Sequence, residues 1–179
     1  MSKTRKNYNR DINRAFPPVQ AQVLRELAPG EMTVKPATTQ RASNATLSAD
    51  PDLVVDILAD VPYLIEAFLP ITTGATPGFK FDFAGGTLGT SQTTYFLGIG
   101  VLKTANEAAS AATDITAVNT AVNPTAAAHT RGYARVTAKF SASGTLALRW
   151  AQNTSNVTAA QLLNGATLSA TPLDLLTGK

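Results

Sequence analysis

The fold is decided by residues 132–152, where GYARVTAKF (132–140) and TLALRWAQ (145–152) are joined by the short connection SASG (141–144). Both flanking segments alternate small or apolar residues with polar ones. Leu146, Leu148 and Trp150 share one face of the second segment. A period of two is typical of a strand with one buried face, and the Ser- and Gly-containing connection favours a turn. A second turn and an apolar run over 162–173 follow, so we predict that 131–173 forms the sheet core of an all-β domain.

Further strands are predicted upstream, where apolar residues recur at every second position. We expect strands over 53–58, 63–71, 79–83 and 93–103, which are separated by turns rich in Gly, Pro and Asp. In the last of these, Tyr95, Leu97, Ile99 and Val101 share one face. At least one strand is expected within 104–130, because a structureless loop of that length is unusual. Regular short strands of this kind predict an antiparallel β-sandwich of jelly-roll type.

Aromatic residues are the predicted anchors of this sandwich. Phe79, Phe81 and Phe83 alternate with polar residues in the clearest strand of the chain, and Trp150 lies on the apolar face of its own segment. We expect all four in the core or at a subunit interface, where Trp150 would bury on the order of 200 Å². Its indole N–H would then need an acceptor. Sugar stacking is the alternative role for Trp150 if its ring is exposed.

Residues 1–46 are predicted to form an extended basic N-terminal arm, and residues 47–179 the β-sandwich domain. The net charge of the chain is +3. Residues 1–41 hold eight Lys and Arg against three acidic residues, which leaves the remainder slightly acidic. Two interpretations of the arm stay open: a solvated, disordered tail, or docking on an acidic surface or nucleic acid. The docking candidates are Lys3, Arg5, Lys6, Arg10 and Arg14. Two interleaved aromatics are too few to indicate base stacking.

Composition argues against catalysis and metal binding. The chain has no Cys and a single His, His129, so thiolate sites and His clusters are not expected. Asp82 and Glu66 could form a carboxylate pair, but both occupy the polar faces of predicted strands. The aspartates of 50–60 are interpreted as turn caps and solvated strand ends. We therefore expect no enzyme, no cofactor, no metal and no small-molecule substrate. The chain also has no apolar run long enough to span a membrane and no secretion signal.

A family resemblance adds a functional expectation. Residues 144–158 (GTLALRWAQNTSNVT), followed by LLNGATL (162–168), resemble a C-terminal pattern of tailed-bacteriophage structural proteins. Upstream, LSADPDL (47–53), the strand that starts at Tyr63, and FKFDF (79–83) look like the opening of the same domain. The resemblance extends from residue 47 to residue 173, and neither the arm nor 104–130 contributes to it.

The resemblance implies a virion protein with a jelly-roll sandwich that forms a homotrimer. Its expected role is that of a capsid decoration (cement) protein on the outer surface of the head. There the arm would dock on the major capsid protein and stabilise the shell. The alternative is a tail fibre, baseplate or receptor-binding appendage module. That role would need an exposed aromatic platform, for which Trp150, Tyr95 and Tyr133 are the candidates.

Overall fold

The computed structural model describes residues 30–74, 76–85, 88, 93–104, 109–123 and 128–173. Their regular structure is almost entirely β-strand, and none of the described residues lies in an α-helix. No helix in this part of the chain is therefore long and apolar enough to cross a membrane. The strands are, in chain order, β1 (Glu31–Val34), β2 (Thr39–Arg41), β3 (Ser48–Ile57), β4 (Pro62–Thr72), β5 (Lys80–Gly85), β6 (Thr93–Lys103), β7 (Ala109–Ile115), β8 (Arg131–Phe140), β9 (Gly144–Ala151), β10 (Ala160–Leu162) and β11 (Thr167–Pro172).

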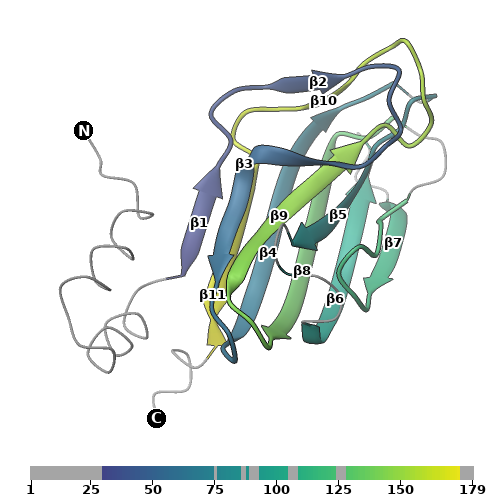
Figure 1. Cartoon of the computed structure of the whole chain (residues 1–179). Coiled ribbons are helices and arrows are strands. Elements are labelled where there is room, and N and C mark those ends of the chain that lie inside the picture. The colour runs from purple at the N-terminus through teal and green to yellow at the C-terminus, as the bar shows by residue number, and fades with distance from the viewer. Residues whose placement is uncertain are drawn as a thin grey trace.

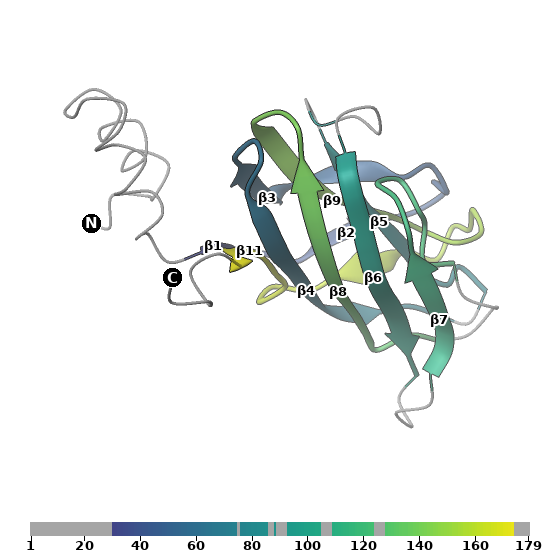
Figure 2. The same ribbon diagram turned by 90° about the horizontal axis from the view of Figure 1, so that it is seen from below.

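The strands form two sheets that pack as a sandwich (Figures 1 and 2). The large sheet has the order β1-β11-β4-β8-β6-β7, and β10 joins it by pairing with β4 and with β2. The small sheet has the order β3-β9-β5. Every strand pair among the described residues is antiparallel. The prediction of an all-β antiparallel sandwich is confirmed.

The strand pairs are nested in the sequence. β1 pairs with β11, β3 with β9, and β4 with β8, while Phe81 of β5 forms an isolated bridge with Val122. The chain therefore pairs like the two arms of one long hairpin. The pairs β1–β11, β2–β10 and β4–β8 belong to the large sheet, and the pair β3–β9 belongs to the small sheet. The hairpin β6–β7 is inserted between β5 and Val122, and it extends the large sheet beyond β8.

The short connection between β8 and β9 carries the chain from one sheet to the other. β8 pairs with β4 and β6 in the large sheet, whereas β9 pairs with β3 and β5 in the small sheet. Both strands nevertheless bury one face in the same core, because they face each other across the sandwich. The predicted sheet core over 131–173 is thus divided between two sheets.

Aromatic side chains fill the space between the sheets. Phe79, Phe81, Phe83 and Trp150 are all fully buried. The rings of Phe79 and Trp150 stack with centroids 5.3 Å apart and an interplanar angle of 14°. The large sheet contributes alternate residues of β4 and β8 to the same core, among them Ile65 and Val136. The four predicted anchors therefore lie in the core of this single chain.

The structure places the start of the folded domain earlier than the sequence predicted. Residues 1–29, with the five docking candidates of the arm, lie outside the described residues. β1 pairs with β11 along its whole length, and β2 pairs with β10. The domain therefore begins by Glu31 rather than at residue 47. Strand periodicity is weak in this segment, because these short edge strands depend on backbone pairing with strands far along the sequence.

Candidate functional site

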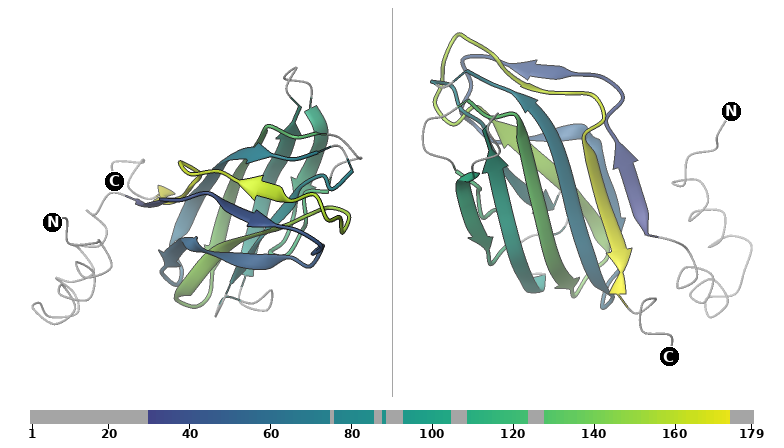
Figure 3. Two further views of the ribbon diagram at one scale, coloured as in Figure 1. Left: turned by 90° about the horizontal axis from the view of Figure 1, so that it is seen from above. Right: turned by 180° about the vertical axis from the view of Figure 1, so that it is seen from behind.

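The outer face of the large sheet, which points away from the core, carries large exposed apolar side chains on the strands β1, β4, β8 and β6. The strand register places one row of side chains across six strands, from the edge strand β1 to the edge strand β7. In order, the row consists of Val34, Thr167, Phe68, Tyr133, Val101 and Ala112. Figure 3 (right) shows this sheet from the outer side. Such a row is unusual, because a solvated sheet face normally carries polar residues.

The exposure of large apolar side chains is concentrated on this outer face. Of the eight that the described residues expose, only Val157, in the loop between β9 and β10, lies elsewhere. The other seven are Met32, Val34, Phe68, Tyr95, Leu97, Ile99 and Tyr133. Leu97 is the most exposed of these seven, at 61%. The concentration of exposed apolar side chains on one face indicates an interaction surface rather than scattered exposure.

The two faces of β6 are both apolar. Tyr95, Leu97, Ile99 and Val101 do share one face, but that face is the outer one. The core receives Phe96, Gly98, Gly100 and Leu102 from the same strand. The strand is apolar on both sides, so its period could not show which side is buried.

Polar groups at the centre of the outer face bond to one another. Tyr133 Oη donates a hydrogen bond to Glu66 Oε1 at 3.2 Å, and Arg135 Nε lies 3.6 Å from the same oxygen. Partial burial, and then the Glu66 carboxylate, raise the pKa of Tyr133. Thr137 Oγ1 donates to the carbonyl oxygen of Leu97 at 3.2 Å. These groups already have partners, which lowers the cost of removing them from water.

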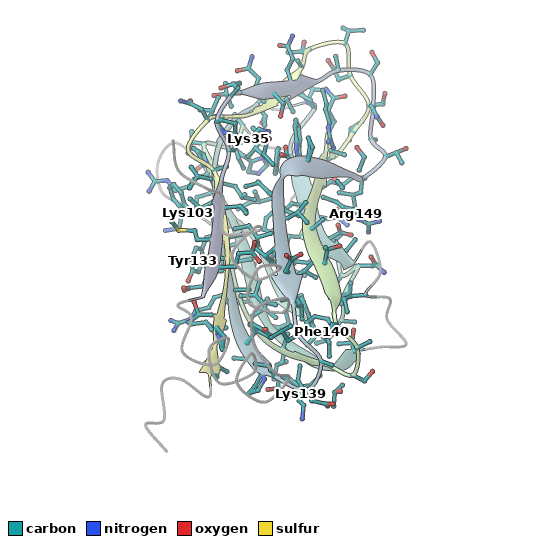
Figure 4. All side chains as sticks on the ribbon, turned by 60° about the vertical axis from the view of Figure 1, so that its left-hand side comes forward. Lys35, Lys103, Tyr133, Lys139, Phe140 and Arg149 are labelled. Carbon is teal, nitrogen blue, oxygen red and sulfur yellow. The ribbon has the colours of Figure 1, made fainter. Side chains whose placement is uncertain are left out.

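Lysines border the apolar centre at both ends of the strands. Lys103 and Lys139 lie at opposite ends of the face, with Tyr133 between them (Figure 4). Lys139 Nζ is 3.7 Å from Asp60 Oδ1, and Lys103 lies opposite Arg131 in the register. The surface therefore combines exposed apolar side chains with an internally paired polar group at its centre, and it carries lysines at the ends of the strands.

A buried charge cluster holds the N-terminal strands against the sandwich. Lys35 Nζ donates to both carboxylate oxygens of Asp50 and to Asp52 Oδ2, each at 2.9 Å. Trp150 Nε1 donates to Asp50 Oδ2 at 3.0 Å, which supplies the acceptor that the buried indole requires. Lys35 and Asp50 are both fully enclosed. The expectation of solvated caps is therefore wrong for Asp50.

Arg41 completes this cluster on the other side of the indole ring. Its Cζ atom lies 4.2 Å from the centroid of the Trp150 ring, a cation–π geometry. The guanidinium also donates to the carbonyl oxygens of Ser48, Ala49 and Trp150. Burial lowers the pKa of Arg41. Lys35 and Arg41 thus form hydrogen bonds within the folded domain, although the sequence analysis placed both residues in the basic N-terminal arm.

The proposed carboxylate pair is not assembled. Asp82 lies in the small sheet, where Arg149 Nε and Nη2 donate to its two oxygens at 2.8 and 2.5 Å. These hydrogen bonds raise the pKa of Arg149. Glu66 lies on the outer face of the large sheet, so the sandwich separates the two carboxylates. In Figure 4, Arg149 and Tyr133, the hydrogen-bond partner of Glu66, accordingly lie on opposite sides of the molecule.

His129 is buried, and it is not grouped with other potential metal ligands. Its backbone N–H donates to Thr73 Oγ1 at 3.2 Å, and burial lowers the pKa of its imidazole. Across the described ranges, no group of three or more His, Asp or Glu side chains is placed to hold a metal ion.

The aromatic platform of an appendage module is not formed from the three predicted residues. Trp150 is fully buried, which rules out sugar stacking on its ring in this structure. Tyr95 and Tyr133 are exposed, but Tyr133 lies opposite Val101, six residues from Tyr95 along β6. At about 3.3 Å per residue, this separates them by about 20 Å. One sugar ring could not contact both.

Comparisons with known proteins do not identify a family for this chain. No protein-family model and no curated protein matches the sequence. Among solved structures, the chain is similar to one described as "Structure of infectious bursal disease virus Gx strain", with 11% sequence identity and a TM-score of 0.23. The similarity covers 80% of this chain and 40% of that chain. A TM-score of this size does not establish a common fold, so the functional argument depends on the strand pairing and surface of this chain.

Proposed function

We propose that this chain is a virion structural protein, and specifically a capsid decoration protein that stabilises the head of a tailed bacteriophage. The single observation that carries the proposal is the apolar outer face of the large sheet. A sheet face that exposes seven large apolar side chains is poorly suited to permanent contact with water, and it favours a protein that functions inside an assembly. This is a binding role, without catalysis or a cofactor.

The nested strand pairing supports the proposal. The nested pairs join strands far apart in the chain within an antiparallel sandwich, and on this basis we propose a jelly-roll type, an architecture used by viral capsid and lectin domains. The phage-like pattern of 144–158 occupies β9 and the loop that follows it. Within that pattern, Trp150 and Gln152 have structural roles, because both are fully buried.

The basic N-terminal segment gives the proposal a second contact. Residues 1–29 hold six basic and two acidic residues. We propose that Lys3, Arg5, Lys6, Arg10 and Arg14 dock on an acidic surface of the major capsid protein, and that nucleic acid is not the partner. Many copies on one shell would turn a modest affinity per copy into strong attachment.

A binding experiment with purified particles tests the function. Labelled full-length protein is mixed separately with heads and with tails, and the bound copies per particle are counted. Decoration predicts hundreds of copies on each head and none on tails, whereas a few copies on tails would favour the appendage function. A variant with Ala at the five arm residues should bind heads more weakly and with a smaller dependence on salt. If that variant binds like the wild type, docking through the arm is wrong.

A further inference from the structure

We infer that the outer face of the large sheet packs against the same face of a second copy of this chain. The inference concerns the purified protein alone, and it stands whether or not the chain binds phage heads. It rests on four properties of the face: its residue types, its charge, its relief and its area.

The residue types match those of a protein–protein contact. Interface centres are enriched in Tyr, Phe, Met and Arg and depleted in Lys and Glu. The outer face carries Phe68, Tyr133 and Arg135 near its middle and Met32 on its edge strand, and it places its lysines at the ends of the strands. Its one central Glu, Glu66, is paired with Arg135. This distribution gives a centre whose polar groups are already paired and a charged border that remains in water.

The charge of the face suits contact with an identical surface. Two copies present the same charges to each other, so a strongly acidic or basic centre would repel itself. Here the central charges are Glu66 and Arg135, which lie 3.6 Å apart and neutralise one another. An oppositely charged partner would find no excess of charge at this centre to bind.

The relief of the face suits packing against another sheet. In the row that crosses the sheet, the large side chains Phe68 and Tyr133 are flanked by the smaller side chains of Thr167 and Val101. Two sheets that pack face to face interdigitate their side chains at a separation of about 10 Å. Projecting rings beside smaller residues provide the ridges and gaps that such packing needs.

The area is sufficient for a stable contact. Six strands about 4.8 Å apart span about 24 Å, and the outward residues of β6 from Tyr95 to Lys103 span about 26 Å. This corresponds to roughly 600 Å² per copy and roughly 1,200 Å² for the pair, at the lower end of the range for specific interfaces.

The mass of the full-length protein in solution is the first test. We expect the wild type to have the mass of more than one chain, and Leu97→Glu or Phe68→Glu to have the mass of one. Val157→Glu is the matched control, because Val157 is 85% exposed but lies in a loop away from the face. It should keep the wild-type mass. Unchanged circular dichroism would show that the variants remain folded.

Cysteine labelling is a second test that does not perturb the contact by charge. The chain contains no Cys, so Leu97→Cys and Val157→Cys each introduce one reactive thiol. We expect maleimide to label Leu97→Cys severalfold more slowly in concentrated than in dilute protein, and Val157→Cys at one rate throughout.

Two outcomes would overturn the inference. One is a wild type that stays at the mass of a single chain at every concentration. The other is an oligomer whose mass is unaffected by Leu97→Glu and Phe68→Glu. If the thiol of Leu97→Cys is protected only when heads are added, the face contacts the capsid, so the decoration function survives and the self-contact is wrong.

Discussion

A single carboxylate, that of Asp50, joins three segments that are far apart in the sequence. It accepts hydrogen bonds from Lys35 and from Trp150, and these contacts connect the N-terminal strands to the small sheet. A buried ion pair adds little net stability compared with a packed apolar pair, but removing one partner leaves the other charge without compensation. Asp50 is therefore the position where a small change should have a large effect.

We predict that Asp50→Asn lowers the free energy of unfolding by about 3 kcal/mol, because Lys35 loses its main buried anion. Urea unfolding followed by tryptophan fluorescence measures this loss. Asp60→Asn is the control, since the Asp60 side chain is 76% exposed and its pair with Lys139 is a surface pair. It should cost less than about 0.5 kcal/mol. Equal costs for the two variants would contradict the role assigned to Asp50.

His129 gives the molecule a predictable response to acid. Burial lowers its pKa in the folded state, whereas the unfolded chain should keep a pKa of about 6.5. Below that pH, the unfolded state binds a proton that the folded state does not, so acid favours unfolding. Stability should therefore fall as the pH drops through 6.5, roughly the unfolded-state pKa. His129→Gln should show a shallower fall in urea unfolding over the same range, and an identical slope would contradict this assignment.

At the scale of the element, β6 needs a glycine at position 100, because the segment around Val122 packs closely against the inner face of this strand. A methyl group at Gly100 would overlap Val122 Cγ2 and lie 3.0 Å from Ile115 Cδ1. Val122 belongs to the segment that bridges to Phe81 and continues the nested pairing. The glycine therefore allows the segment around Val122 to approach the large sheet while bridging to the small one.

We predict that Gly100→Ala destabilises the fold by about 1–3 kcal/mol through overpacking. Val122→Ala removes the overlapping methyl group, so the double variant should be more stable than the sum of the two single costs by about 1 kcal/mol. Gly132→Ala is the matched control and should cost less, since its added methyl would come no closer than 3.2 Å to a side-chain atom, whereas a methyl at Gly100 would overlap Val122 Cγ2. Urea unfolding of the four proteins completes the cycle, and strictly additive costs would contradict the proposed overlap.

At the scale of the whole molecule, both ends of the described chain leave the domain at one edge. Glu31 lies opposite Ala170 in the register, so the root of the N-terminal segment is beside the last strand (Figure 1). Met32 and Val34 of the same edge strand belong to the apolar outer face. The proposed capsid-docking segment thus begins next to the proposed contact between copies.

Truncation tests where the domain begins. Deleting residues 1–29 leaves all contacts among the described residues in place, so the unfolding free energy should change little. Deleting residues 1–41 also removes β1, β2, Lys35 and Arg41, and it leaves Asp50 as a buried anion without its cation. That loss should cost about 3 kcal/mol or more, measured by urea unfolding. If the two truncated proteins are equally stable, the domain begins at residue 47, as the sequence predicted, and not by Glu31.

The positions of the strands could be predicted from the sequence because the signals are local. Alternation over 93–103 corresponds to β6 at Thr93–Lys103, and the predicted strand over 132–140 corresponds to β8 at Arg131–Phe140. The buried aromatics Phe79, Phe81, Phe83 and Trp150 follow from the same alternation, because a strand with one polar face has only one side to bury. The strand that we expected within 104–130 is β7.

The tertiary structure decided which surfaces are covered. β6 is apolar on both sides, and only its pairing with β8 and the position of the small sheet determine that Leu102 is buried while Leu97 is exposed. The Lys35–Asp50–Trp150 cluster likewise joins residues up to 115 positions apart, which no local pattern encodes. By itself the sequence determined where most strands after residue 47 form, because alternation and turn residues act over a few positions, whereas β1 and β2 were missed because they depend on distant partners. Only the tertiary structure determined the candidate interface, because exposure depends on which segments pack against each face.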